Sequence, residues 1–389
     1  MSKAVMKSAK GFDKEVALVL QGGGALGSYQ AGVYEALANS AYLPTWIAGI
    51  SIGAINAAII AGNAPADRVE KLRAFWDKIT TPANVWPISQ FSPNVDRQAG
   101  AVSALLFGQP GFFTPRTPLA WISPEKPTSF YDTVALRNTL EHLVDFDRIN
   151  AREMRFSVGA VNVQTGQFAY FDNHEVRIRP EHIMASGALP PGFPGVEIDG
   201  QVYWDGGLVS NTPLRHVLEY EPRISRLTFQ VDLFQAYGKL PETLDEVSER
   251  EKDVRYASRT RAATQAFEAL HNIRSHAHDL WELLPAEIRA LPEAKFLEPL
   301  GCVTEMDIVQ LIYRPFEPQG GSKDYEFSRG TMLARWQEGL RDAQTTLEAA
   351  PWLAPVPKNV GARVFDVMHD ILVAELGAPM PRKPENVKR

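Results

Sequence analysis

The sequence is poor in cysteine and has no long hydrophobic run. Cys302 is the single cysteine among 389 residues, which excludes an internal disulfide and gives no sign of an oxidising compartment. No apolar stretch approaches the roughly 18 residues of a membrane-spanning helix. The apolar run at residues 16–20 is too short for a signal peptide. We therefore expect a cytoplasmic protein whose membrane contact, where it occurs, is peripheral.

An excess of positive charge is also missing. The formal net charge is -6, from 40 Lys and Arg against 46 Asp and Glu. Nucleic acid is not expected as the main partner, because neutralising its phosphates requires an excess of basic residues. His271, His276 and His278 lie near one another in the sequence, but no carboxylate or cysteine frames them at metal-ligand spacing. We expect neither a metal nor another cofactor.

What is present is the composition of a globular protein, with 45% hydrophobic and 22% charged residues. Residues 16–20 and 45–50 are short apolar runs typical of buried parallel strands, and each leads into a turn and a helical pattern. The stretch at 80–130 is rich in Pro, Gly and aromatic residues, which predicts long ordered loops that act as a lid. Further elements are expected as helices at 66–79, 133–144, 246–290, 327–348 and 361–376, as hairpins around Gly166 and Gly200, and as strands at 226–234 and 306–313.

The order of these elements predicts a three-layer α/β/α fold with a mainly parallel central sheet and a mostly helical C-terminal extension. We divide the chain into an N-terminal arm at 1–14, a catalytic domain at 15–235 and an extension at 236–389. The strand at 306–313 could return to the main sheet. Residues 247–291 predict an amphipathic helix that packs on its own domain, or alternatively one that faces a membrane.

A possible nucleophile stands in the second strand-to-helix turn. Residues 49–53 read Gly-Ile-Ser-Ile-Gly, a G-x-S-x-G pattern, with Ser51 at its centre. A nucleophile elbow needs this context, because the turn is so sharp that Gly49 and Gly53 cannot carry side chains. The sequence therefore predicts that Ser51 is a nucleophile.

The first strand-to-helix turn is rich in glycine. Gly22, Gly24 and Gly27 satisfy G-x-G-x-x-G, a pattern that also occurs in dinucleotide-binding proteins. A dinucleotide site requires an acidic residue at the end of its second strand, where this chain has Ser51. Exposed backbone N–H groups in such a loop also suit an oxyanion hole. We expect this hole to be formed by Gly22, Gly23, Gly24 and Ala25.

The base that activates the serine is sought downstream. None of the eight histidines has a sequence context that marks it as catalytic. Asp205 follows a strand and precedes Gly206 and Gly207, which leave room for the close approach of another loop. An aspartate has an ordinary pKa of about 3.9, so we expect an apolar, lid-shielded site to raise the pKa of Asp205.

Together these motifs resemble those of the patatin-like phospholipases. The resemblance covers about residues 15–215 and includes the segments MASGALPPGFP and VSNTP around the aspartate. It implies that Ser51 and Asp205 form a catalytic dyad, that the glycine loop is the oxyanion hole, and that a lipid or other acyl ester is hydrolysed through an acyl-enzyme. The remaining chain is similar to the C-terminal extension of a bacterial subgroup.

One residue departs from the family pattern. Many patatin-like proteins have Arg or Lys just before the last glycine of the loop, where this sequence has Leu26. The backbone donors survive this change, so "lipid acyl hydrolase" describes the expected activity better than "phospholipase". Two alternatives stay open at this point: a catalytically weak lipid-binding or scaffolding protein, and a dinucleotide-binding oxidoreductase. The sequence leaves the oligomeric state open.

Overall fold

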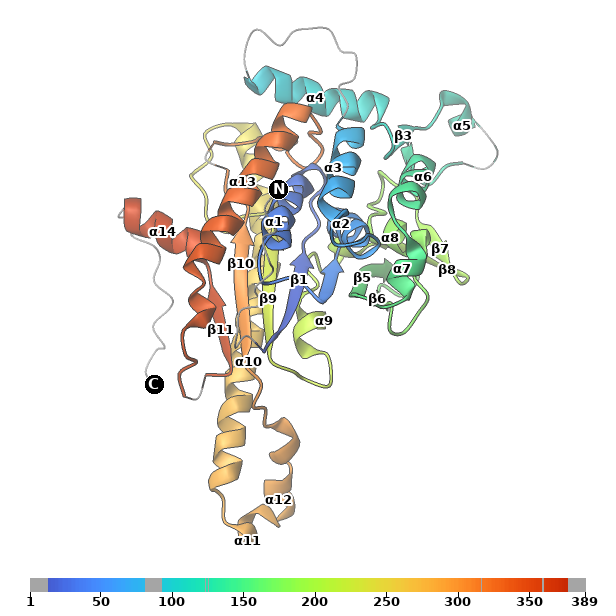
Figure 1. The fold of residues 1–389 in the computed structure, drawn as a ribbon. Helices are drawn as coiled ribbons and strands as arrows, with labels where there is room; N and C mark the ends of the chain where they lie inside the picture. Colours follow the sequence, from blue (N-terminus) through green and yellow to red (C-terminus); the bar gives the residue numbers. More distant parts are fainter. Residues whose placement is uncertain are drawn as a thin grey trace.

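The computed structural model describes residues 13–80, 93–122, 124, 126–315, 317–358 and 360–376. Within these residues, a central sheet of nine strands runs through the molecule (Figure 1). Its strands are β1 (Glu15–Leu20), β2 (Trp46–Gly49), β5 (Arg155–Asn162), β6 (Phe168–Asp172), β7 (Val196–Ile198), β8 (Gln201–Asp205), β9 (Arg226–Asp232), β10 (Met306–Ile312) and β11 (Ala362–Phe365). A separate two-stranded sheet pairs β3 (Thr114–Pro115) with β4 (Tyr131–Asp132).

The sheet is mainly parallel, as the sequence predicts. The strand order is β11-β10-β9-β1-β2-β5-β8-β7, and the pairs from β11 to β5 are all parallel. The expected hairpins form the antiparallel edge, where β5 pairs with β6 and β8 pairs with β7. Because parallel strands end at the same edge of a sheet, the turns after β1 and β2 are brought together.

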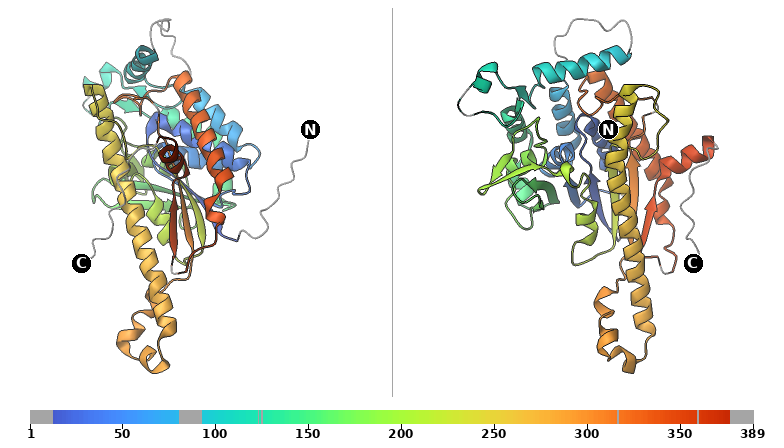
Figure 2. Two further views of the ribbon diagram at one scale, coloured as in Figure 1. Left: turned by 90° about the vertical axis from the view of Figure 1, so that its left-hand side faces the viewer. Right: turned by 180° about the vertical axis from the view of Figure 1, so that it is seen from behind.

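Helices cover both faces of the sheet, which confirms the three-layer prediction (Figure 2). Val16, Leu18 and Leu20 of β1 join the core on one face, and Ala17 and Val19 join a second core on the other. The first face carries α1 (Ser28–Ala38), α2 (Ile52–Ala61), α3 (Arg68–Ile79) and α13 (Arg329–Ala349), and the second carries α9 (Leu214–Glu219) and α10 (Leu244–Leu283). The alternation of a strand's side chains therefore builds two cores.

The C-terminal part of the chain adds to the main sheet and packs on its helices. β10 pairs with β9, and β11 pairs with β10. In α1 and α13 the backbones touch: a Cβ on Gly32 would lie 1.9 Å from the Trp336 oxygen, and one on Gly339 would lie 2.1 Å from the Tyr29 oxygen. Strands from both sides of residue 235 thus share one sheet. The division into domains at this residue stays a prediction.

Two expectations about elements are wrong. The stretch at 80–130 contains helices α4 (Pro93–Phe107) and α5 (Pro118–Ile122) rather than loops throughout. Each helix begins at a proline, which the first turn of a helix tolerates, so the proline content misled the prediction. The part of this stretch at 81–92 lies outside the described residues. The helix expected at 361–376 is divided into strand β11 and helix α14 (Val367–Leu376).

The stretch at 246–290 forms mainly one long helix. α10 has 40 residues, and its far end projects from the body together with α11 (Ala286–Arg289) and α12 (Pro292–Lys295) (Figures 1 and 2). In the described part of the chain, no helix combines the length and apolar character needed to cross a bilayer. The shorter helices α6 (Val134–Leu143), α7 (Phe146–Asn150) and α8 (Pro180–Ser186) cover the antiparallel end of the sheet.

Candidate active site

Ser51 occupies a strained turn between β2 and α2. Its backbone has φ 56° and ψ -123°, a conformation that is costly for a residue with a side chain. A Cβ on Gly49 would lie 2.2 Å from the Gly53 oxygen, and one on Gly53 would lie 2.4 Å from the Leu20 oxygen. Both flanking positions therefore require glycine. The geometry is that of the elbow expected from the sequence.

The turn is held by a residue that the sequence reasoning missed. The backbone N–H of Ser51 donates to Ser186 Oγ at 3.0 Å, and Ser186 is fully buried at the end of α8. This serine belongs to the MASGALPPGFP segment, so the resemblance of that segment to the family was an available signal. Ser186 fixes the elbow from a second direction.

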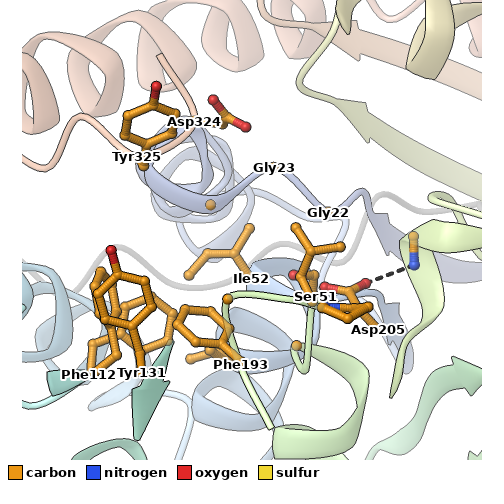
Figure 3. Close-up of a pocket in the computed structure, with 18 of the residues that line it drawn as sticks. Gly22, Gly23, Ser51, Ile52, Phe112, Tyr131, Phe193, Asp205, Asp324 and Tyr325 are labelled. Carbon is orange, nitrogen blue, oxygen red and sulfur yellow. Dashed lines mark hydrogen bonds between the residues drawn. The ribbon is translucent and has the colours of Figure 1, made fainter. Parts of the chain in front are cut away.

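Asp205 lies beside Ser51 at the end of β8 (Figure 3). The carboxylate is almost fully buried and its Oδ1 accepts the N–H of Gly207 at 2.7 Å. Burial raises the pKa of Asp205 to about 6, although hydrogen bonding with Gly207 and Ser51 opposes this rise. The carboxyl group is thus poised to gain or lose a proton near neutral pH.

The other motif glycines allow close packing around these two side chains. A Cβ on Gly206 would lie 2.7 Å from the Gly159 oxygen, so Asp205 is brought onto β5 by a close backbone contact. A Cβ on Gly27 would lie 2.6 Å from Ile52 Cγ1, which brings the glycine loop onto the start of α2. These glycines shape the site without contributing functional groups.

The glycine loop follows β1 and runs into the short helix η1 (Gly24–Gly27). The N–H of Gly22 donates to the Asn211 oxygen at 3.1 Å, and Asn211 Nδ2 donates back to the Gly22 oxygen at 2.9 Å. The N–H of Ala25 donates to the Asp324 oxygen at 2.8 Å. Within the described residues, the N–H groups of Gly23 and Gly24 have no acceptor. Two of the four expected oxyanion donors are therefore already engaged.

Ser51, Asp205 and the glycine loop open onto one cavity of about 290 Å³ (Figure 3). Its polar end is formed by these groups and Asn211. Most of the rest of its wall is apolar and aromatic, with Ile52, Ile55, Leu105, Phe112, Phe113, Tyr131, Leu189, Phe193, Phe234 and Phe327. Such a cavity can take an acyl chain and place its carbonyl group at the polar end.

Part of the cavity wall comes from the C-terminal region. Tyr256 of α10 and the residues Asp324, Tyr325 and Phe327 before α13 all line it. Their role could not be read from the sequence, because no motif marks them and they are far in the chain from Ser51. Leu26, in contrast, is an uncharged residue that is fully buried in the core. The loop therefore contributes no charged side chain to the cavity at this position.

Comparisons with known proteins agree with these motifs. A family model described as patatin-like phospholipase matches residues 18–218, which is more than half of the chain. A second model, described as patatin phospholipase, matches residues 254–359. A search of curated proteins found no match.

Solved structures with similarity to the chain include three from different organisms. VipD from Legionella pneumophila is 14% identical with a TM-score of 0.38, and the match covers 94% of this chain and 77% of that one. Human GIVD cytosolic phospholipase A2 is 12% identical with a TM-score of 0.37, with coverage of 86% and 59%. A chain of the ExoU-SpcU complex from Pseudomonas aeruginosa is 14% identical with a TM-score of 0.32, with coverage of 86% and 51%.

Proposed function

The chain belongs to the patatin-like phospholipase family, and we propose that it hydrolyses the acyl esters of lipids with a Ser51-Asp205 dyad. The observation that carries this proposal is the placement of a strained elbow serine against a buried aspartate at the polar end of an apolar cavity. Family membership supports the substrate class, and the geometry supports the roles of the residues.

In the proposed reaction, Ser51 Oγ attacks the ester carbonyl carbon while Asp205 accepts the hydroxyl proton. The N–H groups of Gly23 and Gly24 stabilise the oxyanion that forms. The tetrahedral intermediate collapses, the alcohol leaves with the proton from Asp205, and the acyl group stays on Ser51. Water then attacks the acyl-enzyme with Asp205 as base again, which releases the fatty acid and restores the serine.

The proposed oxyanion hole has two N–H donors, fewer than the four that the sequence predicted. Gly22 and Ala25 use their N–H groups within the protein, on Asn211 and Asp324. Gly23 and Gly24 lie between them and line the cavity next to Ser51. We therefore assign the stabilisation of the oxyanion to these two residues.

Acyl esters in general suit the site better than phospholipids alone. The buried Leu26 replaces the cation that many relatives have at this position, so the loop offers no charge to a phosphate headgroup. The apolar wall of the cavity suits the acyl chain instead. A cytoplasmic enzyme in peripheral contact with a membrane would meet such substrates. A lipid-binding or scaffolding role without turnover is the alternative.

A labelling experiment separates these functions. An alkyl fluorophosphonate should modify the wild-type protein stoichiometrically, and mass spectrometry should locate the adduct on Ser51. Ser51→Ala should abolish both labelling and turnover of p-nitrophenyl esters, while Ser258→Ala, at an exposed serine of α10, should leave both unchanged. A folded wild-type protein with neither labelling nor turnover would support the scaffolding role. Thermal stabilisation by NAD or NADP would instead support a dinucleotide site.

A further inference from the structure

The segment formed by residues 319–326, which we call the C-terminal clamp, touches the glycine loop. The carbonyl oxygen of Asp324 accepts the N–H of Ala25 at 2.8 Å. The same oxygen lies 2.0 Å from the position that a Cβ would take on Gly24, whose φ is +54°. Asp324 also lines the cavity that the loop lines (Figure 3). The clamp therefore holds the end of the loop by backbone contact.

The clamp is in turn held by a buried lysine. Lys323 has 1% of its side chain exposed, and its Nζ lies 2.6 Å from Asp253 Oδ1 and 3.3 Å from Glu249 Oε1. Both carboxylates belong to α10. Glu249 Oε2 also accepts the N–H groups of Gln319 and Gly320, at 2.9 and 2.8 Å. A buried ammonium group is stable only with such partners, so the clamp is tied to α10 in one arrangement.

Other side chains fix the backbone on either side of Lys323. Arg335 of α13, itself buried, donates to the oxygens of Lys323 and Glu326 at 3.0 and 3.2 Å. Lys252 of α10 donates to Asp324 Oδ1 at 2.6 Å. The carbonyl group of Asp324 is therefore aimed at Ala25 by two helices of the C-terminal region.

We propose that Lys323 is a positioning residue for the oxyanion hole and acts through the Asp324 carbonyl on the glycine loop. This inference rests on the proposed hydrolase function. Because Ala25 donates to Asp324, the peptide groups before it are held with the N–H groups of Gly23 and Gly24 free for the substrate. The C-terminal region is then part of the catalytic machinery. It does more than cover the cavity.

The physical reason is that an oxyanion hole works only when its donors are already oriented. Gly24 has a positive φ and no side chain, so its own peptide groups can rotate easily. A hydrogen bond to the next residue removes this freedom. Without the clamp, the loop would lose conformational entropy each time it became ordered in the catalytic cycle. The transition state would then be stabilised much less.

The test removes the lysine together with Asp253, the nearer of its two carboxylate partners. In Lys323→Met/Asp253→Asn, one positive and one negative charge disappear together, and Glu249 keeps its two backbone donors. We expect kcat for a p-nitrophenyl ester to fall about 100-fold, the loss typical of one oxyanion donor, while KM changes less than about threefold. The rate of fluorophosphonate labelling should fall in parallel. Lys323→Arg, which keeps the positive charge, should retain most of the wild-type kcat.

The matched control is a partly buried Lys-Asp pair. Lys14 Nζ lies 2.8 Å from Asp307 Oδ2, and Asp307 stands near the start of β10, at the edge of the sheet opposite to the site. Lys14→Met/Asp307→Asn should lower the unfolding midpoint but leave kcat unchanged. A folded Lys323→Met/Asp253→Asn variant with wild-type kcat would overturn the inference. Where that variant does not fold, Lys252→Met carries the same test with a smaller expected loss.

A second measurement separates this inference from the proposed function. Amide hydrogen exchange over residues 21–30 should become faster in Lys323→Met/Asp253→Asn than in the wild type and in the control variant. Unchanged exchange would contradict the positioning role, whether or not the protein hydrolyses esters. A wild-type protein that neither hydrolyses esters nor labels at Ser51 would refute the function, and exchange would still report on the clamp.

Discussion

Two strand-to-helix turns meet at the candidate site, and they are held in shape differently. The elbow after β2 is shaped mainly by its own glycines and by the neighbouring strand, because Gly49 and Gly53 leave no room for a Cβ. The glycine loop after β1 ends on the carbonyl group of Asp324, about 300 residues later in the chain. The elbow thus depends on its own glycines, β1 and Ser186, whereas the loop also depends on the C-terminal part of the chain.

Substitutions in the two turns should therefore affect different properties of the protein. A change in the elbow disturbs the core packing of β1 against α2, so it should affect folding first. A change in the loop disturbs a surface of the cavity, so it should affect the rate first. The predictions below test this separation.

The largest effect is expected for Gly53→Ala. Its new Cβ would lie 2.4 Å from the Leu20 oxygen in the centre of the sheet, where the backbone cannot move aside. We expect a loss of about 3 kcal/mol in the free energy of unfolding, enough to reduce soluble yield, as measured by chemical denaturation. Gly330→Ala, where a Cβ meets nothing within 4 Å, is the control and should fold normally. A stable Gly53→Ala protein would show that the elbow is less constrained than its contacts suggest.

Asp205→Asn should leave the elbow intact and remove the proposed base. The amide oxygen can still accept the N–H of Gly207, so the fold is kept. We expect kcat to fall about 100- to 10,000-fold, measured with a p-nitrophenyl ester. A loss smaller than tenfold would indicate that Ser51 relies on another base.

The pH dependence of the wild type provides a separate test of Asp205. The base must be ionised to accept the proton of Ser51, and burial raises the pKa of Asp205 to about 6. The rate should therefore fall about tenfold for each pH unit below this value and level off above it. This acidic limb of the pH–rate profile should be absent from the residual activity of Asp205→Asn. A limb that one histidine substitution abolishes would contradict the dyad.

Gly24→Ala tests the loop side of the comparison. The new Cβ would lie 2.0 Å from the Asp324 oxygen, and φ +54° is unfavourable for alanine. We expect kcat to fall about 100- to 1,000-fold, because the N–H groups of the loop are displaced. The unfolding midpoint should change much less than in Gly53→Ala. If both properties fell together, the two turns would not differ in the way described.

The smallest effect on stability is expected for Ser51→Gly. Glycine adopts φ 56° without strain, so the free energy of unfolding should rise by about 0.5–1 kcal/mol while activity is lost. The same change at Ser258, in the middle of α10, should lower it by about 0.5 kcal/mol. Denaturation curves for both variants measure the strain at the elbow directly. Equal destabilisation by both changes would argue against that strain.

Much of the fold could be predicted because its signals are local. Strands β1 and β2 are continuous apolar runs, and the turn at Asp199 and Gly200 follows a standard hairpin pattern. Helix α4 was missed because Pro93 at its start and the proline and aromatic residues on either side of it resembled a loop. Strand β11 was missed because four residues next to a helix carry too little pattern of their own.

In the candidate site, too, the local features could be predicted and the long-range contacts could not. Ser51 and Asp205 stand in short motifs whose glycines predict tight backbone contacts, so the sequence pointed to both. The engaged N–H groups of Gly22 and Ala25 could not be predicted, because their acceptors belong to Asn211 and Asp324. Only the three-dimensional structure relates partners that are so distant in the chain.

The hydrogen bond between Ala25 and Asp324 also has a consequence for biosynthesis. The ribosome makes the chain from its N-terminus, and domains begin to fold as they emerge. Ser51 and Asp205 are both synthesised well before Asp324, so the carbonyl group that accepts the N–H of Ala25 is added after both. A nascent chain that already contains Ser51 and Asp205 still lacks the partner of Ala25. The hydrogen bond between Ala25 and Asp324 can therefore form only after residue 324 has been synthesised.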